Sequence, residues 1–311
     1  MNNREIIEWL LKGDVSIQYQ VHRDLLDNER HDLREKIAKE GWGAKYLSKR
    51  WPDGYWSEKF YQPKWISAHY TLLELKNLGV TPDNKDIRQS INRIAKEEKS
   101  LDGGVNPSVT LENSDVCVNG MFLNYASYFL TNEALLKSII DFILSQQLAD
   151  GGFNCRYNSS GAVHSSLHST LSVLEGITEY LNNGYSYKSD ELEKVSLASK
   201  EFILLHQLFI SDRTGQIIKK DFLRFVYPCR WKYDILRALD HFQYSKTEWD
   251  KRMQPAIDVI MKKRTADMIW KAQTNHPGKV YFIMEKAGEP GRWNTLRALR
   301  VLKHFNIVRF H

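Results

Sequence analysis

The chain has 311 residues, of which 42% are hydrophobic and 26% charged, and its formal net charge is +6. This length allows one packed core, and the positive charge is spread without a Lys/Arg block, which excludes a strongly basic nucleic-acid-binding face and favours an anionic small molecule. The first residues lack the apolar segment of a signal peptide, and no run of about 18 apolar residues would span a bilayer. The three cysteines, Cys117, Cys155 and Cys229, lie far apart and suit a reducing cytoplasm better than a disulfide framework, so we expect a cytoplasmic protein.

Apolar residues recur at helical spacing along most of the chain, and no stretch shows sustained strand alternation. The predicted helices alternate between two kinds. The first kind is Leu-rich and mixed in character, and it comprises Val15–Leu26, Trp65–Leu78, Asp115–Leu130, His164–Tyr180, Cys229–Phe242 and Arg292–Phe305. The second kind carries more charge on one face, as an outward-facing helix does, and it comprises Ile6–Leu11, Ala44–Lys49, Lys85–Glu98, Glu133–Gln147, Glu191–Phe209 and Glu248–Lys263.

The alternation predicts an all-α fold, an (α/α)6 toroid of alternating inner and outer helices, in which the inner helices form a barrel and the outer ones a sleeve. We expect a single domain over residues 1–311. Its first helical hairpin and closure would occupy residues 1–40, and the hairpin repeats would occupy residues 41–311.

A turn of similar chemistry recurs between the helices. Its copies are Asp53-Gly54-Tyr55-Trp56, Asp102-Gly103-Gly104-Val105, Asp150-Gly151-Gly152-Phe153 and a degenerate Asp212-Arg213-Thr214-Gly215. A turn that recurs once for every two helices is typical of helical-hairpin arrays. The glycines permit a left-handed stop after each outer helix, and a glutamine such as Gln147 offers its amide to the helix end.

The block Gln146-Gln147-Leu148-Ala149-Asp150-Gly151-Gly152-Phe153 resembles the repeat of the squalene cyclase and protein prenyltransferase β-subunit superfamily. The resemblance extends from about Leu47 to the end of the chain and is sharpest in this third repeat. It implies a terpenoid-cyclase-like toroid whose central cavity takes an isoprenoid-type or other apolar ligand, in a transferase, a cyclase or a binding protein.

In such a toroid the N-termini of the inner helices cluster around one mouth of the barrel, where ligands collect. The starts of the predicted inner helices are rich in His, Cys, Trp and Arg. Arginine grips a diphosphate with two donors, and aromatic side chains can wall an apolar cavity. The candidate substrate-binding residues are Trp65, His69, Arg230, Trp231, Arg292 and Trp293.

The resemblance also implies a catalytic zinc site. In prenyltransferase β-subunits an Asp-x-Cys pair at one inner helix start and a histidine at the next hold the metal, and Asp115, Cys117 and His168 match that pattern. Carboxylate, thiolate and imidazole with one open position suit a catalytic zinc. A purely structural role for these residues stays open, in which Asp115 is a helix-capping acid, Cys117 a small buried thiol and His168 a hydrogen-bonded core residue.

Asp115 is also the candidate catalytic residue without a metal. The chain lacks the Asp-x-Asp-Asp motif with which cyclases protonate an alkene or epoxide. A lone acid such as Asp115 or Glu112 could still donate a proton if burial raised its pKa.

Two other classes of function stay open. Toroids with paired carboxylates include glycosidases and polysaccharide lyases, for which Glu112 and Asp115 would be the pair. A non-catalytic toroid that binds a partner protein or a lipid is the other. If Arg237 and Arg297 point inward, they need acidic partners among Asp234, Asp240 and Glu175, and such a network would favour a polar substrate.

Overall fold

The computed structural model describes residues 1–108 and 113–308, and this part of the chain is mostly helical. The chain divides into two compact units. Unit 1 consists of Met1–Ser48, Leu78–Val80 and Leu205–His311, and unit 2 of Lys49–Asn77 and Thr81–Leu204. In the described residues, no helix combines the length and the apolar character needed to cross a membrane.

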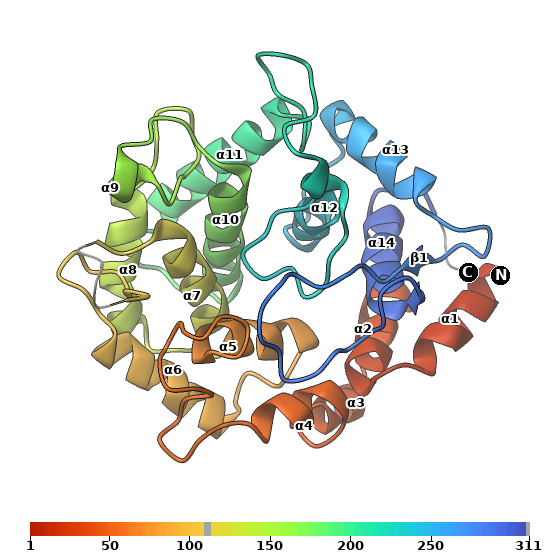
Figure 1. Ribbon diagram of the computed structural model, residues 1–311, viewed down its shortest axis with the longest axis horizontal. Coiled ribbons are helices and arrows are strands. Elements are labelled where there is room, and N and C mark those ends of the chain that lie inside the picture. Colours follow the sequence, from red (N-terminus) through yellow and green to blue (C-terminus); the bar gives the residue numbers. More distant parts are fainter. Residues whose placement is uncertain (109–112, 309–311) are drawn as a thin grey trace. The chain divides into compact units, whose positions relative to one another are not determined.

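The six helices predicted as the Leu-rich, mixed set are all present (Figure 1). Most of their residues are buried. They are α2 (Val15–Leu25), α5 (Ala68–Leu78), α7 (Val116–Tyr128), α10 (Leu167–Asn182), α12 (Ile235–Tyr244) and α14 (Arg292–His304). The second predicted set is also present: α1 (Asn3–Leu11), α4 (Gly41–Leu47), α6 (Lys85–Glu97), α8 (Glu133–Ser145), α11 (Ser189–Leu205) and α13 (Gln254–Lys262).

Burial separates the two sets as expected. In α7 nearly every side chain is buried, whereas α6 buries a single stripe of Ile87, Ser90, Ile91, Ile94 and Ala95. A one-sided stripe at this spacing belongs to a helix that covers a core. The all-α prediction is therefore confirmed for the described residues, with mostly buried helices alternating with helices buried on one side.

The structure adds short elements that the periodicity did not predict. These are α3 (His31–Lys36), α9 (Tyr157–Ser160), the 3-10 helices η1 (Lys220–Leu223) and η2 (Lys251–Met253), and the strands β1 (Trp270–Lys271) and β2 (Pro290–Gly291). The two strands pair antiparallel, with Trp270 opposite Gly291.

Two helix boundaries differ from the prediction because the backbone turns left-handed. The sequence pattern predicts α12 from Cys229, yet the helix begins at Ile235, since Arg230 has a φ of 59° and Asp234 caps the helix by accepting a hydrogen bond from Arg237 N at 2.9 Å. At the end of α11, Gln207 and Leu208 have φ values of 42° and 67°, which stop the helix before Phe209.

The Asp-Gly turns behave as the sequence indicates. Gly103 and Gly151 have φ values of 89° and 90°, which only glycine adopts without strain. Gln147 Nε2 donates to the carbonyl oxygen of Gly151 at 3.1 Å, so the amide does connect the helix end to the turn.

The aspartates of these turns also fix where the following helix begins. Asp102 accepts hydrogen bonds from Ser114 N at 2.6 Å and from Ser114 Oγ at 2.8 Å, directly before α7. Asp150 accepts from Ser165 N at 2.8 Å and from Ser165 Oγ, directly before α10. The two helices therefore start in the same way, each two residues after a tethered serine.

Unit 2 is built around the close packing of α7 on α10, which lie side by side in Figure 1. Gly120 and Gly176 permit this approach. A Cβ atom at Gly120 would lie 2.6 Å from Val173 Cα and 2.7 Å from Ser172 O, and one at Gly176 would collide with Gly120 O. Close packing at the two glycines therefore fixes the start of α7, which carries Asp115 and Cys117, relative to the start of α10, which carries His168.

Candidate functional site

Asp115 is the N-cap residue of α7, but its side chain does not cap the helix. Among residues 1–108 and 113–308, no group is hydrogen-bonded to its carboxyl oxygens. Asp14, Asp234 and Asp250 occupy N-cap positions too, and each of them accepts a backbone N–H hydrogen bond. Asp115 is therefore an acid at a helix start whose carboxyl group does not cap the helix.

The environment of Asp115 favours its neutral form. Its side chain is half-buried, and this burial raises the pKa above the ordinary aspartate value of 3.8. The nearby Lys64 ammonium opposes part of the rise. A raised pKa beside a cation is the property expected of an acid that gives up a proton and is then stabilised as a carboxylate.

One aromatic side chain, Tyr61, lies within electrostatic range of this acid and belongs to an aromatic group. The charge of Asp115 contributes to raising the pKa of Tyr61, after burial, which places the two groups within electrostatic range. Tyr61 Oη and Tyr70 Oη are 2.8 Å apart, and the Trp65 ring lies 4.8 Å from that of Tyr70, centroid to centroid. Trp65, a predicted substrate-binding residue, thus belongs to the aromatic group near Asp115. Tyr61 was not predicted, because it precedes α5 and nothing in its local sequence indicates the contact.

His69, also predicted to bind substrate, is fully buried in unit 2. The rings of Phe60, Tyr61, Tyr70 and Tyr125 surround it at centroid distances of 4.9 to 5.7 Å. Its Nδ1 lies 3.3 Å from Tyr125 Oη, and burial lowers its pKa to about 3. His69 is therefore neutral at physiological pH and cannot act as the acid of this site.

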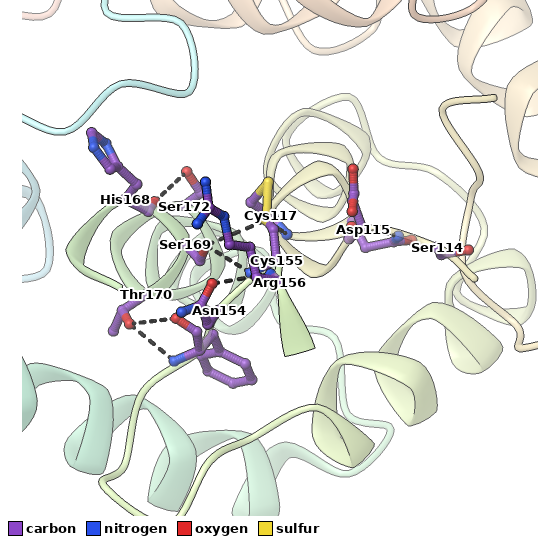
Figure 2. Close-up of a disulfide and its surroundings, with 12 residues drawn as sticks. Ser114, Asp115, Cys117, Asn154, Cys155, Arg156, His168, Ser169, Thr170 and Ser172 are labelled. Carbon is purple, nitrogen blue, oxygen red and sulfur yellow. Dashed lines mark hydrogen bonds between the residues drawn. A yellow bond between two sulfur atoms is a disulfide. The ribbon is translucent and has the colours of Figure 1, made fainter. Parts of the chain in front are cut away.

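Cys117 forms a disulfide with Cys155, which corrects the expectation of unpaired thiols for these two residues (Figure 2). The bond joins the first turn of α7 to the segment before α9, with 6.0 Å between the two Cα atoms. This pairing joins cysteines 38 residues apart and depends on how distant segments pack, so it could not be predicted from local sequence. Cys229 is outside any disulfide.

The structure does not bring the three predicted zinc ligands together. In Figure 2, Asp115 and His168 lie on opposite sides of the disulfide that occupies Cys117. Within the described residues, no group of three or more His, Cys, Asp and Glu side chains could hold a metal ion. Glu112, the other candidate acid, lies outside the described residues.

Two of the four remaining predicted binding residues have structural contacts in unit 1. Arg292 Nε donates to Trp9 O at 3.1 Å, and its guanidinium lies 4.6 Å above the Trp9 ring. Trp293 is buried against Trp42 and Tyr227, with its backbone N–H directed at Glu285. Arg292 thus ties α14 to α1, and Trp293 packs in the core.

Arg230 and Trp231 lie in the segment before α12, where positive charge is concentrated. Arg230 is buried, and Lys232 Nζ lies 4.0 Å from the centroid of the Trp231 ring. Burial, followed by Lys232, Arg224 and Arg230, lowers the pKa of His276 to about 4. The three cationic groups therefore lie within electrostatic range of His276, and the charge of Asp221 opposes part of their effect.

An acidic partner expected for the buried arginines is present in unit 1. Arg297 Nε donates to Asp240 Oδ2 at 3.3 Å, and Arg300 contacts both Asp240 and Asp24. Asp234 is buried nearby, and burial raises its pKa to about 6 against the opposing charge of Arg297. This polar network holds α14, α12 and α2 together.

Lys64 and Tyr61 thus lie within electrostatic range of Asp115, Tyr70 contacts Tyr61, and Trp65 packs against Tyr70, all in unit 2. Comparison with known proteins adds nothing to this assignment: no family model matches the sequence, and no curated protein matches it.

Proposed function

We propose that this protein is an enzyme of the terpenoid class, in which Asp115 protonates a carbon–carbon double bond of an isoprenoid-type ligand. The observation that carries the proposal is the uncapped, half-buried carboxyl group of Asp115, whose pKa is raised beside aromatic rings. We also propose the (α/α)6 toroid as its architecture, supported by the alternation of mostly buried helices with helices buried on one side.

The chemistry follows from the groups around the acid. Asp115 transfers its proton to one alkene carbon, so a C–H bond forms, the π bond breaks, and a carbocation remains on the neighbouring carbon. The π faces of Tyr61, Tyr70 and Trp65 stabilise such a cation, by about 0.5–2 kcal/mol for each well-placed ring. The Lys64 ammonium stabilises the carboxylate that Asp115 becomes.

A protonation of this kind is tested in deuterium oxide. The purified protein would be incubated with squalene or with geranylgeranyl diphosphate, and the products would be analysed for deuterium bound to carbon. We expect a deuterated isomer or cyclised product from the wild type. Asp115→Asn should form none while binding the same ligand, since the amide has nearly the shape of the acid but cannot donate this proton.

Asp83→Asn is the matched control, because Asp83 is an exposed aspartate of the same unit, in the loop before α6. It should react like the wild type. Equal turnover by Asp115→Asn and the wild type would refute the role of Asp115. Absence of binding of either polyprenyl ligand, with binding of an oligosaccharide instead, would favour the glycan-active class.

A second candidate function is recognition of an anionic group by unit 1. We propose that Arg230, Lys232 and Arg224, whose charges jointly lower the pKa of His276, hold a diphosphate or a similar oxyanion. Titration with inorganic pyrophosphate should give saturable binding that Arg230→Ala weakens and that Arg4→Ala, at an exposed site on α1, leaves unchanged. Equal affinity for both variants would contradict this assignment.

A further inference from the structure

The Cys117–Cys155 disulfide connects two half-exposed residues on different elements of unit 2. Cys117 lies in the first turn of α7, whereas Cys155 lies in the segment between α8 and α9. Asn158 Nδ2 on α9 donates to Ser114 O at 3.2 Å, so α9 also lies against the residues just before α7. Both cysteines are therefore only partly buried, and they lie where two elements of unit 2 meet.

The two sulfur atoms differ in their hydrogen bonds. Cys155 Sγ accepts from Cys117 N at 3.3 Å and from Ser169 Oγ at 3.3 Å (Figure 2). The Cys117 N–H belongs to the first turn of α7 and has no acceptor within its helix. Ser169 is held in place by Cys155 N, which donates to its Oγ at 3.1 Å. Within the described residues, no donor is hydrogen-bonded to Cys117 Sγ.

Hydrogen-bond donors stabilise negative charge on a sulfur atom. When a disulfide is cleaved by a thiolate, the sulfur that leaves carries that charge. Both donors are directed at Cys155, so attack at Cys117 Sγ with departure of Cys155 is the favoured direction.

We propose that Cys117 and Cys155 form a redox-active pair, a reversible modification site for small thiols and their disulfides, with Cys155 as the leaving sulfur. A thiolate forms a bond to Cys117 Sγ while the Cys117–Cys155 bond breaks and its electron pair goes to Cys155. A second thiolate then attacks the sulfur of the bound thiol and releases Cys117. The protein disulfide gains two electrons, and two thiol molecules become one disulfide. Oxidation by a small disulfide reverses these steps.

This exchange controls the covalent link between α7 and residues 154–161, beside the helix start that carries Asp115. The proposal is independent of the reaction assigned to Asp115. An inactive Asp115 would leave the thiol chemistry intact.

The experiment uses reduced and oxidised glutathione on the folded protein, with acid quenching, alkylation of free thiols and peptide mass mapping. We expect reversible interconversion of the disulfide and the two thiols without unfolding, and a transient glutathione adduct on Cys117. An adduct mainly on Cys155 would overturn the proposed direction. A pair that never oxidises, or that glutathione reduces only after denaturation, would overturn the redox activity itself.

Ser169→Ala tests the donor, and Ser172→Ala is its control on the same helix, since Ser172 Oγ donates to His168 O at 3.0 Å. We expect Ser169→Ala to slow reduction about fivefold, the effect of one hydrogen bond, and Ser172→Ala to react like the wild type. Equal rates in both variants would refute the contribution of Ser169. The position of the adduct in the wild type tests the leaving sulfur without any substitution.

Discussion

The buried His69 makes the stability of unit 2 depend on pH, and its replacement by phenylalanine should remove that dependence. The folded protein holds the pKa of His69 at about 3, whereas the ordinary value is 6.5. Because the folded pKa is the lower one, the unfolded chain binds more protons between these values. The stabilising contribution is complete above pH 6.5 and is lost as the pH falls toward 3.

The size of the effect follows from the two pKa values. The full difference corresponds to about 5 kcal/mol, and about 3 kcal/mol of it is lost between pH 7.5 and pH 4.5. In His69→Phe the ring contacts with Phe60, Tyr61 and Tyr70 can remain, while the ionisable group is gone. The variant should therefore lose about 3 kcal/mol less stability than the wild type over this range.

Urea unfolding at the two pH values measures this difference, because other titrating groups are common to both proteins. Tyr125→Phe is the control: it removes the Oη atom near His69 Nδ1 but keeps the histidine, so it should retain the wild-type pH dependence. A pH dependence that is the same in His69→Phe and the wild type would refute the argument. So would an NMR titration in which the His69 ring takes up a proton near pH 6.5.

Three further predictions concern packing, charge and capping. Gly120→Ala should destabilise unit 2 by about 3 kcal/mol in chemical unfolding, because the new Cβ atom would meet the backbone of Val173; an unchanged midpoint would contradict this packing. The wild type should lose about 2 kcal/mol of folding stability as the pH rises from 4 to 7, because burial raises the folded pKa of Asp234 to about 6 and the unfolded chain gives up its proton first. Asp234→Asn should abolish this loss, and parallel stability curves for the two proteins would count against the prediction. Glu285→Ala should reduce folding stability by about 1 kcal/mol and lower the thermal midpoint, because Glu285 accepts a hydrogen bond from Arg292 N at 2.7 Å at the start of α14. A midpoint equal to that of the wild type would show that this contact adds no stability.

The sequence allowed the helices to be predicted because their apolar spacing is local information. The boundaries near Arg230 and Gln207 were less predictable, since a left-handed backbone at a residue other than glycine is imposed by its surroundings. The same limit applies to the site. Asp115 could be proposed from its position at a helix start, whereas its nearness to Tyr61 and Lys64 and the pairing of Cys117 with Cys155 depend on how distant segments pack.

The tethered serines have a consequence for how this chain can change. Because Asp102 holds Ser114 and Asp150 holds Ser165, the residues that follow each serine occupy matching places on α7 and α10. Cys117 and His168 are such a matching pair. Either position can exchange one reactive side chain for another while the tether keeps the helix start in place. A single substitution at either position can therefore change the chemistry of the helix start, because the Asp–Ser hydrogen bonds that position the new side chain are not altered.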